Sequence, residues 1–107
     1  RKGDLLTITQ GMNETMIFIN QKYAEKIKKM FPENQIKKVL NDLSSVTINL
    51  NLEAINVLGL FYQATRALNW ENVNIIDIVS TYTEMTFIVR EEDSTKAFEA
   101  VQRLIKV

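Results

Sequence analysis

The sequence repeats one pattern about seventy residues apart, and this repeat constrains the fold more than any other feature. The run Leu5-Leu6-Thr7-Ile8 matches Ile75-Ile76-Asp77-Ile78, and Met16 to Ile19 matches Thr86 to Val89. Each copy then runs into a segment whose apolar residues have helical spacing. A repeat has to be considered before local secondary structure, because it decides how many units the chain contains. We therefore expect two copies of one small module.

The two copies differ in completeness. Only the second copy is preceded by a further strand and helix, over Val46 to Asn69. We predict a partial unit over residues 1–43, made of strand, strand, helix and strand, and a complete unit over residues 44–107. The chain begins with Arg1 rather than Met, so we expect it to be a piece of a longer protein.

In the first unit, two strands over Asp4 to Met12 and Glu14 to Asn20 are predicted to form a hairpin, with the reversal at Gly11 to Asn13. A helix from about Lys22 should end before Pro32, because the residue before a proline is pushed out of helical geometry. Apolar residues at i, i+4 and i+7 or i+8 form the buried stripe expected for this helix: Tyr23, Ile27, Met30 and Phe31.

A fourth element of the first unit is expected over Gln35 to Leu43. Its apolar residues alternate only loosely, and it carries Lys37 and Lys38. Lysine is common on edge strands, where it discourages pairing with other chains. We therefore predict an edge strand that closes the first unit.

The second unit is predicted to run strand, helix, strand, strand, helix, with a short last strand near Ile105 to Val107. The clean alternation of Val46 to Asn51 indicates a strand with one buried face. A helix is predicted over Glu53 to Leu68, followed by strands over Val73 to Thr81 and Met85 to Val89. A last helix is predicted over Ser94 to Leu104. Its inner face is expected to carry the apolar residues Ala97, Phe98, Val101, Leu104 and Ile105. This order predicts an α+β class and a ferredoxin-like βαββαβ fold, an antiparallel sheet with its helices on one face.

Composition excludes several classes of function. The chain contains no His and no Cys, which removes imidazole bases, thiolate nucleophiles, disulfides and the usual zinc ligands. We find no nucleophile and base pair and no phosphate-binding loop, so we expect no enzymatic activity, no catalytic residue, no cofactor and no bound metal. Three consecutive acids, Glu91-Glu92-Asp93, suit a helix N-terminus better than a cation site.

Charge and hydropathy bear on partners and location. The net charge is zero, but residues 1–43 carry eight Lys or Arg against five acids, while residues 44–107 carry five against eight. This basic excess is too small for a nucleic-acid-binding surface, so we do not expect nucleic acid to be a partner. No apolar run approaches the roughly 20 residues needed to span a bilayer, so no membrane association is expected. The absence of cysteine fits a cytoplasmic protein.

The segment Asn74 to Thr81, followed by Met85 to Val89 and an amphipathic helix, resembles the ACT domain, in particular the C-terminal regulatory modules of aspartate kinases. Gly3 to Gly11, together with Ser45 to Ile48, also looks like small archaeal ACT-repeat proteins that are predicted to regulate amino-acid metabolism. The resemblance covers nearly the whole chain as tandem ACT-like units. It implies a regulatory domain that binds a small effector, often an amino acid, and assembles with other copies.

The resemblance also implies where an effector would bind. ACT domains hold effectors in the loop between the first strand and the first helix, against a strand of a neighbouring unit. Carried over to this sequence, the implied ligand-binding residues are Asn51, Leu52, Glu53, Ala54, Ile55 and Asn56 in the loop, and Asn74, Ile75, Ile76 and Asp77 in the facing strand. The Pro-Gly pair that usually precedes the helix in the family is replaced by Ile55-Asn56.

Several residues allow more than one interpretation. The side chains of Asn51, Glu53 and Asn56 could bind an effector or could cap the following helix. Asp77 faces opposite to its apolar neighbours, either toward the helices or toward a partner sheet. Trp70 could anchor an interface, although we expect it to close the edge of the core.

Two functions from different classes follow. The first is a non-catalytic regulatory domain that binds a small amino-acid-like effector at a unit or subunit interface and regulates amino-acid metabolism. The alternative is an oligomerisation module whose ligand loop has degenerated and whose sheet or helix edges pair with another copy.

Overall fold

The computed structural model describes residues 5–50, 57–81 and 83–105, which belong to two compact units, Arg1–Asn41 and Asp42–Val107. The predicted boundary lay two residues later, between residues 43 and 44. The further interpretation of these units as a partial and a complete copy of one module stays a prediction. We refer to them as unit 1 and unit 2.

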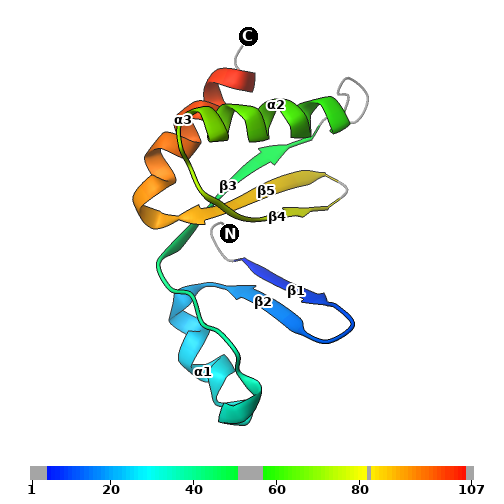
Figure 1. Cartoon of the computed structure of the whole chain (residues 1–107), viewed down its shortest axis with the longest axis vertical. Coiled ribbons are helices and arrows are strands. Elements are labelled where there is room, and N and C mark those ends of the chain that lie inside the picture. Colours follow the sequence, from blue (N-terminus) through cyan, green and yellow to red (C-terminus); the bar gives the residue numbers. More distant parts are fainter. Residues whose placement is uncertain (1–4, 51–56, 82, 106–107) are drawn as a thin grey trace. The chain divides into compact units, whose positions relative to one another are not determined.

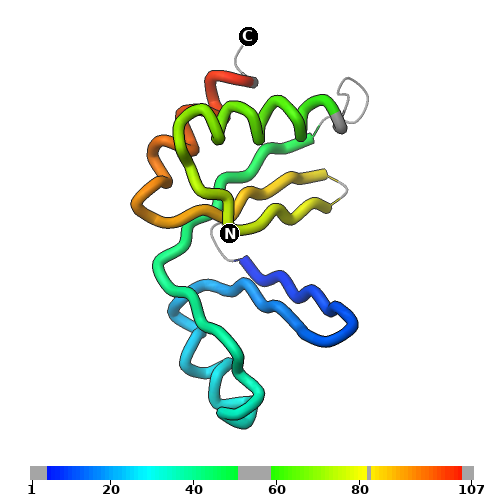
Figure 2. Tube along the Cα trace, viewed as in Figure 1, coloured from blue at the N-terminus to red at the C-terminus, as the bar shows by residue number. Residues whose placement is uncertain are grey.

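Unit 1 begins with a β-hairpin of strands β1 (Leu6–Gln10) and β2 (Thr15–Ile19), visible in Figures 1 and 2. Its turn is closed by a hydrogen bond of 2.7 Å that the Gly11 N–H donates to the Glu14 carbonyl oxygen. The 3₁₀ turn η1 (Gln21–Tyr23), the short helix α1 (Ala24–Lys28) and a second 3₁₀ turn, η2 (Glu33–Gln35), follow. The unit is therefore one hairpin and a little over one turn of α-helix.

Two predictions for unit 1 are wrong. The helix does not bury its apolar stripe: Tyr23 and Phe31 are exposed, and 68% of Met30 is accessible. The predicted strand over Gln35 to Leu43 is also absent, since residues 36–42 have no regular secondary structure and Leu43 already belongs to unit 2. The reason lies in the spacing, because Ile36, Val39 and Leu40 lack the period of two that a half-buried strand needs.

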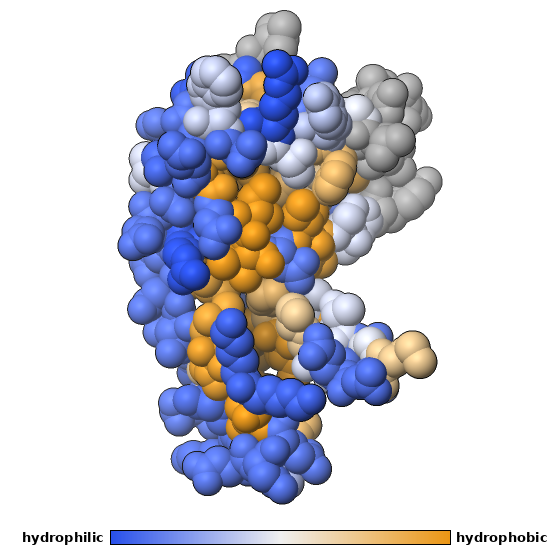
Figure 3. Space-filling view, in the orientation of Figure 1, coloured by the Kyte–Doolittle hydropathy of each residue, from blue (hydrophilic) through white to orange (hydrophobic). Residues whose placement is uncertain are grey.

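No residue between positions 5 and 41 is buried. Hydrophobic side chains accordingly reach the surface of the molecule (Figure 3). In unit 1, the exposed ones include Leu6, Ile8 and Met12. A two-stranded hairpin and a five-residue helix cannot supply the two packed layers that enclose a core. Within the described residues of unit 1, the apolar stripe that periodicity predicted is therefore not buried.

Unit 2 contains a three-stranded antiparallel sheet in the order β3-β5-β4, with strands β3 (Leu43–Asn49), β4 (Ile75–Ser80) and β5 (Glu84–Arg90). Helices α2 (Val57–Trp70) and α3 (Ser94–Ile105) cover one face of this sheet, and the 3₁₀ turn η3 (Glu91–Asp93) leads into α3 (Figure 1). The predicted α+β class and ferredoxin-like arrangement are confirmed. The predicted last strand over Ile105 to Val107 begins on the final residue of α3, and residues 106 and 107 lie outside the described part.

The core of unit 2 lies between the sheet and the two helices. Alternate residues of β3 and β5 face the helices, and they pack against the inner faces of α2 and α3. The buried cluster comprises Val46, Ile48, Leu60, Ala64, Leu68, Val73, Met85, Phe87, Val89, Ala97, Ala100 and Val101. On the opposite, helix-free face, the Thr47 and Thr86 hydroxyl groups form a hydrogen bond of 2.8 Å across β3 and β5.

Helix α2 ends in a Schellman motif. The Val73 N–H donates to the Leu68 carbonyl oxygen and the Asn72 N–H to that of Asn69, both at 3.0 Å. Asn72 adopts a left-handed conformation with φ of 61°. The helix therefore extends to Trp70, and the expectation that Trp70 closes the core is wrong, because 84% of its surface is exposed.

Candidate functional site

The predicted effector site has a loop part and a strand part. The loop part, Asn51 to Asn56, lies outside the described residues. Its flanks are described: the Leu50 N–H donates to the Thr83 carbonyl oxygen at 2.8 Å, directly after β3, and α2 begins at Val57. The segment therefore links the end of the edge strand β3 to the N-terminus of α2.

The strand part, Asn74, Ile75, Ile76 and Asp77, lies at the start of β4, where the ladder with β5 is irregular. Ile75 pairs with Val89 and Asp77 with Ile88, so Ile76 is an extra residue between two consecutive pairs. This is a β-bulge, which removes backbone groups from the regular ladder and redirects side chains, often beside binding sites. The bulge coincides with the segment that the sequence assigned to effector binding.

The bulge also fixes the direction of Asp77. Because Asp77 pairs with Ile88, both side chains lie on the helix-free face, which decides between the two directions left open by the sequence. Asp77 is partly buried, and its Oδ1 accepts a hydrogen bond of 2.7 Å from the Ile78 N–H. A carboxylate has further lone pairs, so Asp77 retains the capacity to accept a donor from a ligand.

The two parts of the predicted site begin at opposite ends of the sheet. Asn49, near the loop, pairs with Glu84 at the start of β5, whereas Ile75 pairs with Val89 near its end. Five residues of strand separate these positions along β5, which corresponds to roughly 17 Å. Figure 1 shows the same separation between the end of β3 and the start of β4. The start of β4 therefore lies at the other end of the sheet from the end of β3.

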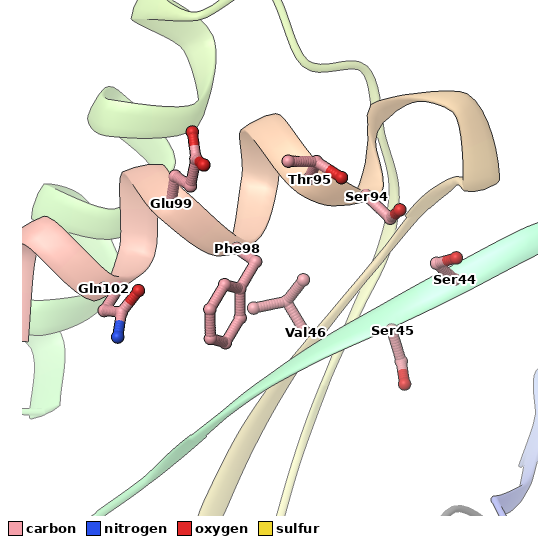
Figure 4. Close-up of a pocket in the computed structure, with 8 residues that line it drawn as sticks. All are labelled: Ser44, Ser45, Val46, Ser94, Thr95, Phe98, Glu99 and Gln102. Atoms are coloured by element: carbon pink, nitrogen blue, oxygen red, sulfur yellow. The ribbon is translucent and has the colours of Figure 1, made fainter.

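A shallow groove of about 460 Å³, which the sequence did not indicate, runs between β3 and α3. Figure 4 shows the Phe98 ring reaching from α3 toward Val46 on β3, with Ser94 and Thr95 at the start of α3. The groove is lined by Ser44, Ser45, Val46, Ser94, Thr95, Phe98, Glu99 and Gln102. Phe98 was expected on the inner face of α3, yet 55% of its surface is exposed because it projects beside the sheet rather than over its centre.

The acidic run Glu91-Glu92-Asp93 forms the η3 turn at the start of the last helix, and Asp93 lies 3.6 Å from the Lys96 ammonium group. Over residues 5–50, 57–81 and 83–105, no three acidic side chains converge in the manner of metal ligands. None of the helices in the same ranges is long and apolar enough to cross a membrane.

Comparison with known proteins identifies the fold. No protein-family model and no curated protein sequence matches this chain. Among solved structures, it is similar to the ligand-free regulatory subunit of aspartate kinase from Thermus thermophilus, with a TM-score of 0.78 and 17% identity over 97% of this chain and 76% of that one. It is also similar to the aspartokinase alpha and beta subunits, with a TM-score of 0.74 and 14% identity over 97% of this chain and 71% of that one. The chain has an ACT-like fold, as the sequence resemblance implied.

Proposed function

We propose that this chain is a non-catalytic regulatory domain that binds a small amino-acid-like effector between two copies and thereby regulates amino-acid metabolism in the cytoplasm. The observation that carries the proposal is the β-bulge between Ile75 and Asp77, at the strand segment that the ACT resemblance assigns to effector contact. The similarity to regulatory subunits of aspartate kinase supports the regulatory role.

The proposed site combines chemically distinct groups. The segment Asn51 to Asn56 of one copy leads into α2, and backbone N–H groups at a helix N-terminus favour the carboxylate of an amino acid. The facing segment, Asn74 to Asp77 of the other copy, contributes backbone groups that the bulge leaves outside the regular hydrogen-bond ladder. In this arrangement the Asp77 carboxylate accepts hydrogen bonds from the effector's ammonium group. One copy therefore binds the carboxylate of the effector and the other copy binds its ammonium group.

Effector binding at such a site can regulate a neighbouring domain because it is thermodynamically coupled to the arrangement of the two copies. An effector that bridges two copies binds one arrangement of the interface better than others and shifts the population toward it. The free energy available to change a neighbouring domain cannot exceed the difference between the effector's binding free energies for the two arrangements. Coupling free energies of this kind are typically about 1 to 3 kcal/mol.

The proposal is tested by thermal unfolding in the presence of each of the twenty amino acids at millimolar concentration. At about 100 times the dissociation constant, a bound effector adds about 2.7 kcal/mol to the free energy of unfolding. One amino acid, or a close group of them, should raise Tm measurably, whereas a flat response to all twenty would refute effector binding of this kind.

The strand part of the site is tested by Asp77→Asn. The substitution keeps an oxygen that can accept the Ile78 N–H but removes the charge. It should abolish the effector-induced rise in Tm while changing the Tm of the free protein little. Glu84→Gln, which neutralises an exposed carboxylate on β5, is the matched control and should leave the rise intact. If Asp77→Asn and Glu84→Gln responded alike, the proposed role of Asp77 would be wrong.

A second candidate function, an oligomerisation module with a degenerated ligand loop, is favoured by the replacement of the family's Pro-Gly pair by Ile55-Asn56. Without that glycine, the backbone cannot approach a ligand carboxylate as closely. Concentration-dependent association combined with no thermal response to any amino acid would favour this candidate over the first.

A further inference from the structure

The groove between β3 and α3 is a part of unit 2 that the proposed effector site does not use. Its volume of about 460 Å³ lies within the range of roughly 300 to 1,000 Å³ that is typical of small-molecule sites. Among the described residues, none that lines the groove belongs to the segments Asn51 to Asn56 or Asn74 to Asp77. A ligand in this groove would therefore be distinct from the effector.

Three side chains at helical spacing form the α3 wall of the groove. Ser94, Phe98 and Gln102 are four residues apart, so they lie along one stripe of the helix and span roughly 12 Å. Figure 4 shows the Phe98 ring and the Gln102 amide on the same side of α3, and Ser94 opposite Ser44 of β3. The stripe therefore presents a hydroxyl group, an aromatic ring and an amide group in that order, and β3 adds a second hydroxyl group.

These groups are available to a ligand. The Phe98 ring lies beside Val46, yet 55% of its surface is accessible. Within residues 5–50, 57–81 and 83–105, the side chains of Ser44, Ser94 and Gln102 form no hydrogen bond. An accessible ring between polar groups suits a flat ligand that stacks on the ring and makes hydrogen bonds at both ends.

The charges around the groove favour a neutral ligand. Glu99 is the only charged residue among those that line it in the described part of the chain, and in Figure 4 its carboxylate points away from the Phe98 ring. The acidic turn η3 comes directly before Ser94. Its carboxylates already occupy the end of α3 where the helix dipole would favour an anion. A phosphate group is therefore disfavoured in this groove.

We propose that the groove binds a purine nucleoside, with its base stacked on the Phe98 ring and the edge of the base at Gln102. The amide of glutamine presents a donor and an acceptor in one plane, which match the N7 acceptor and the N6 amino donor of adenine. The ribose then lies at the start of α3, where its hydroxyl groups meet those of Ser94 and Ser44. This inference goes beyond the proposed regulatory function and does not rest on the effector site.

The open shape of the groove determines the expected affinity. One stacked base and a few hydrogen bonds give a dissociation constant on the order of 1 mM for adenosine. Adenosine monophosphate should bind at least about fivefold more weakly, because its phosphate lies near the carboxylates of η3. Ribose alone should not bind, since it has no aromatic face to stack on Phe98.

The test is an NMR titration of the isotopically labelled full chain with adenosine, followed through the backbone amide chemical shifts. Saturable shifts should appear along Ser94 to Gln102 and along Ser44 to Val46. Phe98→Ala should weaken binding at least about tenfold by removing the stacking surface. Gln102→Leu keeps a side chain of similar size without the amide, and it should weaken binding at least about fivefold. The same spectra show whether each variant keeps the fold.

Trp70→Ala is the control, because it removes another aromatic side chain, 84% exposed, that does not line the groove. It should bind adenosine like the wild type. The proposal would be overturned by the absence of saturable shifts, by unchanged binding to Phe98→Ala, or by monophosphate binding as tight as that of adenosine. The thermal response of Phe98→Ala to amino acids separates this result from that of the effector proposal, because the variant leaves the effector segments intact.

Discussion

The left-handed residue at the end of α2 allows a sharp test of how unit 2 is stabilised. Asn72 has φ of 61°, and its N–H and that of Val73 make the two hydrogen bonds of the Schellman motif. Both bonds use backbone atoms only, and Val73 and Leu68 belong to the buried core. A substitution at Asn72 therefore changes the conformational cost of the left-handed backbone while it leaves the hydrogen bonds and the core contact in place.

The magnitude follows from that cost. A residue with a Cβ atom loses about 1 to 2 kcal/mol in the left-handed region, and asparagine recovers part of this through local hydrogen bonds. We expect Asn72→Ala to lower the free energy of unfolding by about 1 kcal/mol, equivalent to a Tm reduction of about 4 to 8 °C in a domain of this size. Asn72→Gly should stay within about 0.5 kcal/mol of the wild type, because the relief of strain is offset by the greater entropy of glycine in the unfolded chain.

The assay is thermal and urea unfolding followed by far-ultraviolet circular dichroism. Asn69→Ala is the control, since Asn69 is exposed within the same helix and alanine has the higher helix propensity. That variant should be as stable as the wild type or slightly more stable. If Asn72→Ala matched Asn72→Gly, or exceeded the wild type in stability, the argument from the left-handed conformation would be refuted.

Three further predictions concern packing, a buried hydroxyl and an ion pair. Leu68→Ala should lower the free energy of unfolding by about 2 to 5 kcal/mol in urea titrations, because Leu68 is fully buried. Thr47→Val should cost about 1 to 2 kcal/mol by leaving the buried Thr86 hydroxyl without its partner, and combining it with Thr86→Val should cost less than the sum of both single changes. Lys28 lowers the pKa of Glu25 through a hydrogen bond and through its charge, so Lys28→Gln should raise the pKa of Glu25 in a carboxyl NMR titration. Because the pKa of Glu25 is lower in the folded than in the unfolded chain, the pair stabilises the fold above the unfolded pKa. This stabilisation is lost as the pH falls through the folded pKa.

Much of unit 2 could be predicted from the sequence because its signals are local. The alternation of Val46, Thr47 and Ile48 correctly indicated a strand with one face in the core, and the helical spacing of Leu60, Ala64 and Leu68 indicated the helix that covers it. In these segments, propensity, periodicity and tertiary contacts agree, which is the condition under which sequence patterns are reliable.

Other features depend on information that periodicity does not carry. Ile75-Ile76-Asp77 has the composition of a regular strand, and the bulge arises only from its register with β5. The position of Phe98 beside the sheet depends on where α3 crosses β3, which helical spacing does not specify. In unit 1, the same spacing predicted that Met30 is buried, whereas it is exposed, because the hairpin and short helix described there do not form two packed layers.

The absence of buried residues between positions 5 and 41 has a consequence for the timescale on which this part of the chain responds. Segments with few buried contacts open locally at a cost far below that of global unfolding. The backbone amides of β1 and β2 should therefore exchange with deuterium long before those of β5, whose residues Met85 to Val89 are all buried. A partner that covers the hairpin would slow exchange there first, so unit 1 acts as a sensitive reporter of association.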